Sequence, residues 1–166
     1  MSVPGTGPAI VVGVDGSPAS AAALRWAAEQ GRVLRAEVVV VHVWEPSGPR
    51  VAPYAPAAAR PAADDERIAA ARVLAETVRG VMGPHVARTV RAELIEGPPA
   101  RVLPRRARDA ALLVLGHATA TGPVSRACLR HATVPVVTVP APTATVTRLT
   151  GLPGRGGPRR AERGGA

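Results

Sequence analysis

Short runs of apolar residues recur along the chain and predict the strands of a parallel sheet. Four of these runs are rich in valine and too short for helices, and they lie at residues 10–15, 38–44, 111–115 and 134–139. Continuous apolar runs of this length are typical of strands that helices cover on both faces. The pattern therefore indicates a sheet whose central strands are buried.

A fifth segment, residues 90–95 with the sequence VRAELI, alternates between apolar and charged positions. Its apolar side chains would point to one face of a strand, and Arg91 and Glu93 to the other. Alternation of this kind favours a half-exposed edge strand over a central one. We therefore expect this strand at one edge of the sheet.

Between these strands the apolar residues recur at helical spacing and predict four helices. The first should begin at Ser17, a favourable N-cap, with Pro18 at the first helical position. The second should begin near Asp64, because acidic side chains suit a helix N-terminus, and should stop at Gly83, which precedes a proline. The expected buried positions are Leu24, Ala27, Ala28, Gly31 and Leu34 in the first helix and Ile68, Ala71, Ala75, Val78 and Met82 in the second.

The third and fourth helices are shorter. The third should start at the two prolines of positions 98–99 and run towards Asp109, although Pro104 should kink or shorten it. The fourth should span about residues 124–131 and end before Pro135.

The order of elements, β-α-β-loop-α-β-α-β-α-β, predicts one α/β domain: a single open five-stranded parallel sheet with helices on both faces. This domain should cover residues 9–140. Residues 1–8 are expected to be flexible, the Pro/Ala-rich segment 46–63 to be a mobile loop, and the Arg/Gly/Pro-rich segment 141–166 to be a disordered tail.

Ligands of such sheets bind beyond the carboxyl ends of the strands, where the strand order reverses. This rule places Asp15, Val43 and the loop after Gly116 at the candidate site. The segment GVDGS, residues 13–17, joins the first strand to the first helix, whose N-terminus favours an anion. Asp15 has an alternative interpretation as a turn aspartate that caps nearby amides.

The net charge of the chain does not change the function that the elements predict. The 166-residue chain has a formal net charge of +9, and all 21 of its basic residues are arginine. A basic protein can bind nucleic acid, but single-strand binders also need aromatic stacking platforms, and this chain offers only Trp26, Trp44 and Tyr54. We therefore expect solvated surface arginine rather than a nucleic-acid interface. DNA binding through the Arg-rich tail is the alternative.

Neither a secretion signal nor a membrane segment is visible. The N-terminus lacks a basic stretch followed by a long apolar one, and no apolar run approaches the ~18 residues of a membrane span. We therefore expect a cytoplasmic protein with no membrane partner. The single cysteine, Cys128, cannot form an intramolecular disulfide or a thiolate zinc cluster, and we expect it to be a small buried hydrophobe.

Read in order, four segments resemble the universal stress protein family: GVDGSPASAAALRWA, VVVVHVW, ALLVLGH and VSRACLRHATVPVVTVP. The resemblance covers about residues 9–140, except the loop at 46–63. It implies a Rossmann-like sheet of the adenine-nucleotide-binding type, with the strand order 3-2-1-4-5. It also implies homodimerisation and, in many members, binding of ATP or a related adenine nucleotide.

The ATP-binding members of that family carry a set of residues that this chain matches one by one. Their acidic residue at the tip of the first strand corresponds to Asp15, and their valine after a histidine at the end of the second strand corresponds to Val43. Their phosphate loop has the form G-x2-G-x9-G-[ST], in which Gly116 matches the first glycine and Gly122 the last. Val124 matches a position that supplies a backbone amide.

The phosphate loop of this chain departs from the family's pattern. Thr119 stands at the second glycine position and only two residues separate it from Gly122, so seven residues of the spacer are missing. Pro123 replaces the serine or threonine, and proline has no amide hydrogen or hydroxyl to donate. We expect the adenosine half of the site to survive, ATP or another adenine nucleotide to bind weakly, and no metal to bind beyond nucleotide-associated Mg²⁺.

The sequence does not predict catalysis. His117 and His131 have no cysteine, carboxylate or second histidine at ligand spacing, and Ser17 and Ser125 have no partner base in view. With the family resemblance, this indicates a stress-response regulatory protein that is not an enzyme. The alternative is a nucleotide-independent dimeric scaffold that binds protein partners.

The last strand, Val134–Val139, would be an edge in the order 3-2-1-4-5. It is apolar and carries no charged residue that would block pairing, so a bare edge here would invite association. We therefore expect a homodimer that is joined through this strand.

Overall fold

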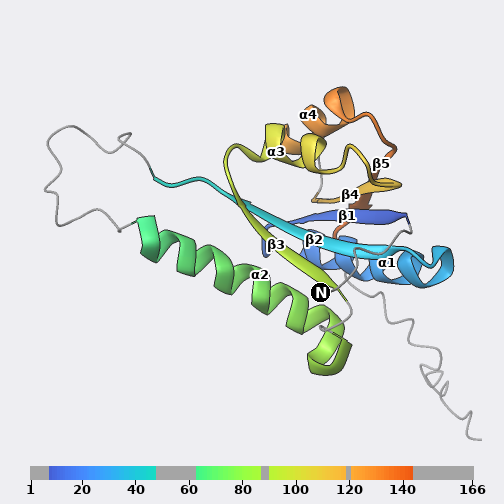
Figure 1. The fold of residues 1–166 in the computed structure, drawn as a ribbon, viewed down its shortest axis with the longest axis horizontal. Helices are drawn as coiled ribbons and strands as arrows, with labels where there is room; N and C mark the ends of the chain where they lie inside the picture. The colour runs from blue at the N-terminus through green and yellow to red at the C-terminus, as the bar shows by residue number, and fades with distance from the viewer. Residues whose placement is uncertain (1–7, 48–62, 87–89, 119–120, 144–166) are drawn as a thin grey trace, which may run out of the picture.

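The computed structural model describes residues 8–47, 63–86, 90–118 and 121–143 (Figure 1). Strands and helices alternate along these residues, as the sequence predicts. In chain order they are β1 (Ala9–Val14), α1 (Pro18–Leu34), β2 (Glu37–Trp44), α2 (Ala63–Val86), β3 (Arg91–Glu96), α3 (Pro99–Arg106), β4 (Leu112–His117), α4 (Pro123–His131) and β5 (Val136–Pro140). Most of the expected flexible N-terminus, of the 46–63 loop and of the 141–166 tail lies outside the described residues.

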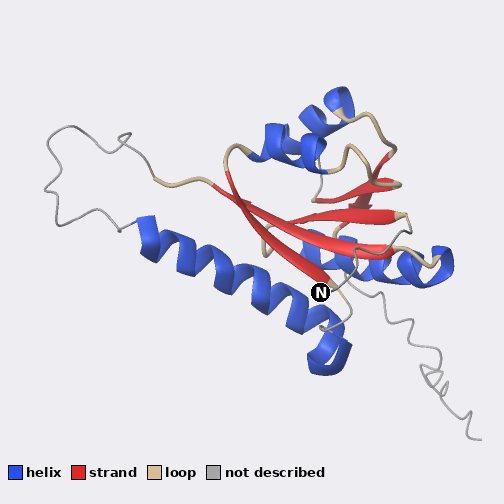
Figure 2. Ribbon diagram, viewed as in Figure 1, coloured by secondary structure: helices blue, strands red, loops and turns tan. Residues whose placement is uncertain are grey.

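The strands form one parallel sheet in the order β3-β2-β1-β4-β5 (Figure 2). The predicted strand order is therefore confirmed. β1 lies at the centre, in register with β2 on one side and β4 on the other. The alternating strand, β3, and the last strand, β5, are the two edges, as predicted.

Two layers of helices cover the sheet, α1 and α2 on one face and α3 and α4 on the other (Figure 1). Side chains of one strand alternate between these layers. Val12 and Val14 of β1 pack under α1, whereas Val11 packs under α3 and α4. Both faces of the central strands are thus buried, which explains their continuous apolar sequence. Among the described helices, none is long and apolar enough to span a membrane.

The predicted buried stripe of α2 is correct only in part. Val78 is buried and Met82 packs against the core, but Ile68 is 54% exposed. The helix instead buries Ala70 and Leu74. Alanine loses little apolar area on burial, so the many alanines of this helix do not fix its rotation. The large side chain of Leu74 does, and it turns Ile68 towards solvent.

Helix ends also differ from the prediction in places. Leu34 is 48% exposed rather than buried, because α1 ends there and Arg35 takes a left-handed conformation with φ of 50°. α3 stops at Arg106 instead of running to Asp109, and Pro104 lies within it. Gly83, with φ of 71°, interrupts the helical geometry of α2 as predicted.

Candidate functional site

A cleft of about 580 Å³ opens at the carboxyl ends of β1, β2 and β4. This is the point where the strand order reverses, because β1 has β2 on one side and β4 on the other. The volume lies within the roughly 300–1,000 Å³ of small-molecule sites. The residues on the strands that line it are Gly13, Val14, Val41, Val43, Leu115, Gly116 and His117.

All five residues that the sequence predicts for the site line this cleft: Asp15, Val43, Gly116, Gly122 and Val124. They come from the ends of three strands and from the start of α4. The sheet topology alone brings them together. The five residues therefore meet at one place in the fold, and their role in binding stays a prediction.

Sequence reasoning missed the wall that α3 contributes. Pro99 and Leu103 also line the cleft, and Leu103 is only 5% exposed. A Cβ on Gly13 would lie 3.1 Å from Leu103 Cδ1, so this leucine packs directly over β1. The spacing of Pro99 and Leu103, one helical turn apart, was the signal for a shared face.

Asp15 stabilises the turn between β1 and α1. Its Oδ1 accepts a 2.9 Å hydrogen bond from the Ser17 amide, and its own amide donates to Ser20 Oγ over 3.3 Å. Ser17 is the N-cap of α1, as predicted, and its hydroxyl accepts from the Ser20 amide. These contacts agree with the alternative interpretation of Asp15 as a turn aspartate.

The Asp15 carboxyl is also held in its charged form. Partial desolvation raises its pKa, but hydrogen bonds from Ser17 and Ser20 together outweigh that effect and leave the pKa below its usual value. No hydrogen bond to Oδ2 is formed within the described residues. Asp15 can therefore offer one carboxylate oxygen to a ligand while the other keeps the turn in place.

Gly116 has a packing role of its own. A Cβ at this position would lie 2.3 Å from the carbonyl carbon of Ala19 and 2.5 Å from the Ser20 nitrogen. The end of β4 thus touches the backbone of the first turn of α1. Gly122 differs, because no atom lies within 4 Å of a Cβ built there.

The N-terminus of α4 faces the cleft. Gly122 is its N-cap, and Pro123 and Val124 are its first two residues. Amides in the first turn of a helix lack intrahelical acceptors, so those of Val124 and Ser125 can donate to an anion. Pro123 has no amide to offer. The structure thus supports at most a small anion-binding turn at this position.

The two histidines His117 and His131 have different positions relative to the cleft. His117 lines the cleft and donates from Nδ1 to the Ala118 carbonyl over 2.9 Å. His131 is exposed at the end of α4 and does not line the cleft. Within the described residues, no group of three or more His, Cys, Asp or Glu side chains could hold a metal ion.

The side chains of two further residues of α4, Ser125 and Cys128, are buried. Ser125 is a buried residue of α4. Cys128 is fully buried in the core beneath α4, and burial raises the pKa of its thiol to about 11. A protonated, inaccessible thiol is a poor nucleophile and metal ligand.

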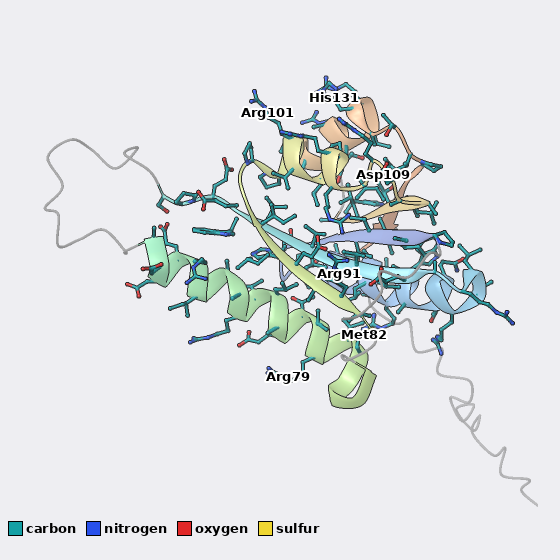
Figure 3. All side chains as sticks on the ribbon, in the orientation of Figure 1. Arg79, Met82, Arg91, Arg101, Asp109 and His131 are labelled. Atoms are coloured by element: carbon teal, nitrogen blue, oxygen red, sulfur yellow. The ribbon has the colours of Figure 1, made fainter. Side chains whose placement is uncertain are left out.

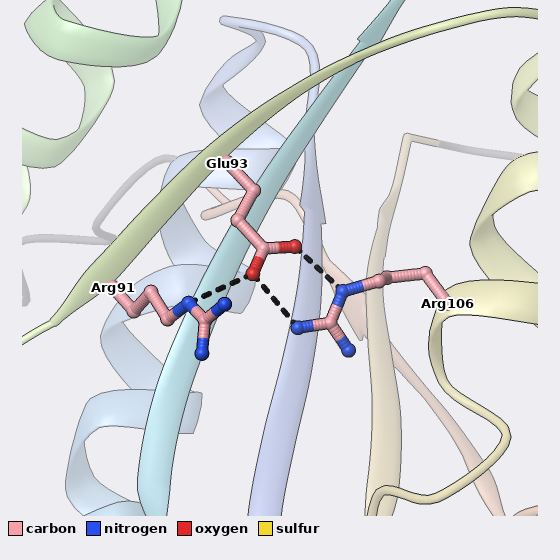
Figure 4. A network of polar contacts seen from close by, with 3 residues as sticks. All are labelled: Arg91, Glu93 and Arg106. Atoms are coloured by element: carbon pink, nitrogen blue, oxygen red, sulfur yellow. Dashed lines mark hydrogen bonds and ion pairs between the residues drawn. The ribbon is translucent and has the colours of Figure 1, made fainter. Parts of the chain in front are cut away.

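An ion pair fastens α3, and with it one wall of the cleft, to the edge strand β3 (Figure 4). Arg106 donates from Nε to one oxygen of Glu93 over 2.6 Å and from Nη2 to the other over 2.8 Å. Arg91 Nε lies 2.9 Å from the same carboxylate. The hydrogen bonds from Arg106 hold the pKa of Glu93 below its usual value, against partial desolvation. The sequence placed Arg91 and Glu93 on one face but did not reveal Arg106 as their partner.

Comparison with known proteins identifies relatives for most of the chain. Residues 8–140 match the model of the Universal stress protein family. A protein of that family from Burkholderia pseudomallei is 30% identical, with 83% of this chain and 100% of that chain aligned at a TM-score of 0.61. No curated protein sequence matches significantly.

Two further solved structures of the same family contain a nucleotide. One, from Archaeoglobus fulgidus, is in complex with dAMP and is 26% identical, covering 80% of this chain and 96% of its own at a TM-score of 0.54. The other, from Arabidopsis thaliana, has AMP bound and is 21% identical, covering 81% and 92% at a TM-score of 0.56. At 21% identity, the similarity to the Arabidopsis thaliana protein shows a shared fold alone.

Proposed function

Because this chain belongs to the universal stress protein family, we propose that it is a stress-response regulatory protein that binds an adenine mononucleotide in the cleft and catalyses no reaction. The observation that carries the proposal is the convergence of Asp15, Val43, Gly116, Gly122 and Val124 on one cleft at the switch point of the sheet.

Each part of a mononucleotide has a candidate contact in the cleft. Val43 of β2, which is partly exposed, offers an apolar surface for the base. The Oδ2 atom of Asp15 can accept a hydrogen bond from a ribose hydroxyl. The amides of Val124 and Ser125 at the start of α4 can donate to one phosphate group. The relative that binds dAMP supports an adenine nucleotide as the ligand class.

We propose that ATP binds no more tightly than AMP. The shortened loop between Gly116 and Gly122 leaves out the part of the family's pattern that would carry further amides, and Pro123 removes one more donor. The second and third phosphates of ATP would therefore lie near few donors. No metal role is proposed beyond Mg²⁺ that accompanies a nucleotide.

We further propose a homodimer that is joined through β5. The Leu113 amide donates to the Pro135 carbonyl, and the Ala141 amide donates to the His117 carbonyl. Alternate residues of a parallel strand direct their backbone amide and carbonyl groups to the same neighbour. The backbone groups of the odd-numbered residues of β5 therefore face β4. The amides of Val136 and Thr138 then point away from the sheet, where a second copy of β5 can accept from them.

The alternative is a dimeric scaffold that binds protein partners without a nucleotide. Two observations favour it. Asp15 accepts a hydrogen bond that stabilises the turn before α1. Gly116 lies so close to the backbone of Ala19 that no larger residue fits there. Both residues therefore have structural reasons to be present whether or not a nucleotide binds.

Position 123 provides a test, because Pro123 is exposed at the first position of α4. Pro123→Ser adds an amide and a hydroxyl beside the expected phosphate, whereas Pro123→Asp adds an amide and a negative charge. We expect calorimetric titration with AMP to give the highest affinity for P123S, an intermediate affinity for the wild type and the lowest for P123D. Adenosine, which has no phosphate, should bind all three proteins equally. If neither ligand binds any of them, the scaffold alternative is favoured.

A further inference from the structure

A second hollow, of about 330 Å³, lies on the outer side of α3, and its lining shares no residue with the cleft. We call it the basic hollow. Four of its seven lining residues are basic side chains: Arg101, Arg105, Arg108 and His131. Arg101 and His131 extend from α3 and from the end of α4 on the same outer side of the molecule (Figure 3). The remaining lining residues are Ala100, Pro104 and Thr133.

The arginines of the basic hollow have no acidic partner in the described part of the chain. The ion pairs found there join Arg67 to Asp64, and both Arg91 and Arg106 to Glu93. The nearest acidic residue along the sequence, Asp109, does not line the hollow. Several positive charges thus converge on one concave site without local compensation.

Helix stability explains only part of this arrangement. A positive charge near a helix C-terminus is favourable, which accounts for Arg105 in α3. Arg101 lies in the first turn of α3, where a positive charge opposes the helix dipole. Arg101 and Arg105 are also four residues apart, a spacing at which like charges repel. A bound anion would relieve both effects.

We infer that the basic hollow binds a small phosphate-bearing anion. The planar guanidinium group donates two parallel hydrogen bonds to phosphate, so neighbouring arginines are suited to such a ligand. The volume of the hollow suits a compact group such as pyrophosphate or a phosphomonoester. An extended nucleic-acid backbone is bound instead by long basic grooves with aromatic platforms. This inference does not depend on nucleotide binding in the cleft.

The test is calorimetric titration of the full chain with pyrophosphate at low salt. The variant Arg101→Gln with Arg105→Gln removes two donors from the hollow. Its matched control, Arg72→Gln with Arg79→Gln, removes the same charge from exposed positions of α2. We expect one saturable site in the wild type, affinity weaker by about tenfold or more in R101Q/R105Q, and an unchanged affinity in R72Q/R79Q. The single variant Arg108→Gln, whose residue lies beyond α3, should weaken binding in the same direction.

Three outcomes would overturn the inference. The first is the absence of saturable pyrophosphate binding. The second is an equal loss of pyrophosphate affinity in R101Q/R105Q and R72Q/R79Q. The third is a loss of pyrophosphate affinity in Pro123→Asp alone, which would place the anion in the cleft. A DNA duplex titrated in parallel separates a nucleic-acid surface from a small-anion site. Duplex binding that depends on Arg101 and Arg105, without pyrophosphate binding, would also contradict the inference.

Discussion

Gly116 of β4 lies directly against Ala19 of α1: a Cβ on Gly116 would be 2.3 Å from the Ala19 carbonyl carbon and 2.5 Å from its oxygen. Both contacts are to backbone, which cannot rotate away as a flexible side chain can. The strand end that borders the cleft is therefore positioned by the first turn of α1. Gly122, the other glycine matched to the family's phosphate loop, has φ of −69° and open space around it.

We predict that these two glycines respond differently to alanine. Gly116→Ala should lower the free energy of unfolding by about 1–3 kcal/mol or more, because β4 and α1 must separate to make room for the methyl group. Gly122→Ala should change it by less than about 0.5 kcal/mol. Urea denaturation measures both. Equal stability of the two variants would mean that β4 does not approach α1 this closely.

The Glu93–Arg106 pair predicts a pH dependence. Because the pKa of Glu93 is lowered in the folded chain, the pair contributes stability above the ordinary glutamate value of 4.5, and this contribution is lost as the pH falls through the folded value. Glu93→Gln should therefore cost about 1–2 kcal/mol at pH 7, allowing for partial solvent screening. The gap to the wild type should close at acidic pH.

Glu76→Gln is the matched control for this prediction, since Glu76 is an exposed residue of α2. The free energy of unfolding of E76Q should equal that of the wild type at every pH. Chemical denaturation at a series of pH values provides the measurement. A deficit in E93Q that stays constant down to acidic pH would show that the charge of Glu93 is not what stabilises the fold.

The β5 interface can be tested through one outward amide. Thr138→Pro removes the donor that faces away from β4 and leaves the β4–β5 ladder intact, since proline is tolerated on an edge strand when its nitrogen faces outward. Thr138→Val keeps that amide. We predict dimers for the wild type and T138V, and a folded monomer for T138P. Sedimentation equilibrium at tens of micromolar decides this, and a dimer of T138P would place the interface elsewhere.

Much of the fold could be predicted because its signals are local. Valine-rich runs such as that of β2 mark buried strands, and Ser17 followed by proline marks the start of α1. The strand-end rule placed Asp15, Val43 and the loop after Gly116 at the candidate site. The strand order, and Gly122 and Val124 as site residues, were predictable only through the family resemblance. The meeting of the five site residues in one cleft follows from the parallel topology, which carries every strand's carboxyl end to the same edge.

What the sequence could not reveal depends on contacts between distant segments. The rotation of α2 is set by the fit of Leu74 to the sheet, and a chain rich in alanine carries little information about that fit. The pairing of Glu93 with Arg106 depends on where α3 packs on the sheet, close enough for its last residue to reach β3. The packing role of Gly116 is visible only once β4 and α1 lie side by side.

Calorimetric titration of the native chain with AMP and with ATP, under identical conditions, tests whether the cleft binds a mononucleotide. We predict saturable binding of AMP and an ATP affinity that is no higher. A variant with a full-length G-x2-G-x9-G-S loop should recover two or more charge-assisted hydrogen bonds, and so bind ATP about a hundredfold to ten-thousandfold more tightly than the native chain. Low-micromolar ATP binding by the native chain, tighter than that of AMP, would rule out the proposed mononucleotide site, as would the absence of AMP binding.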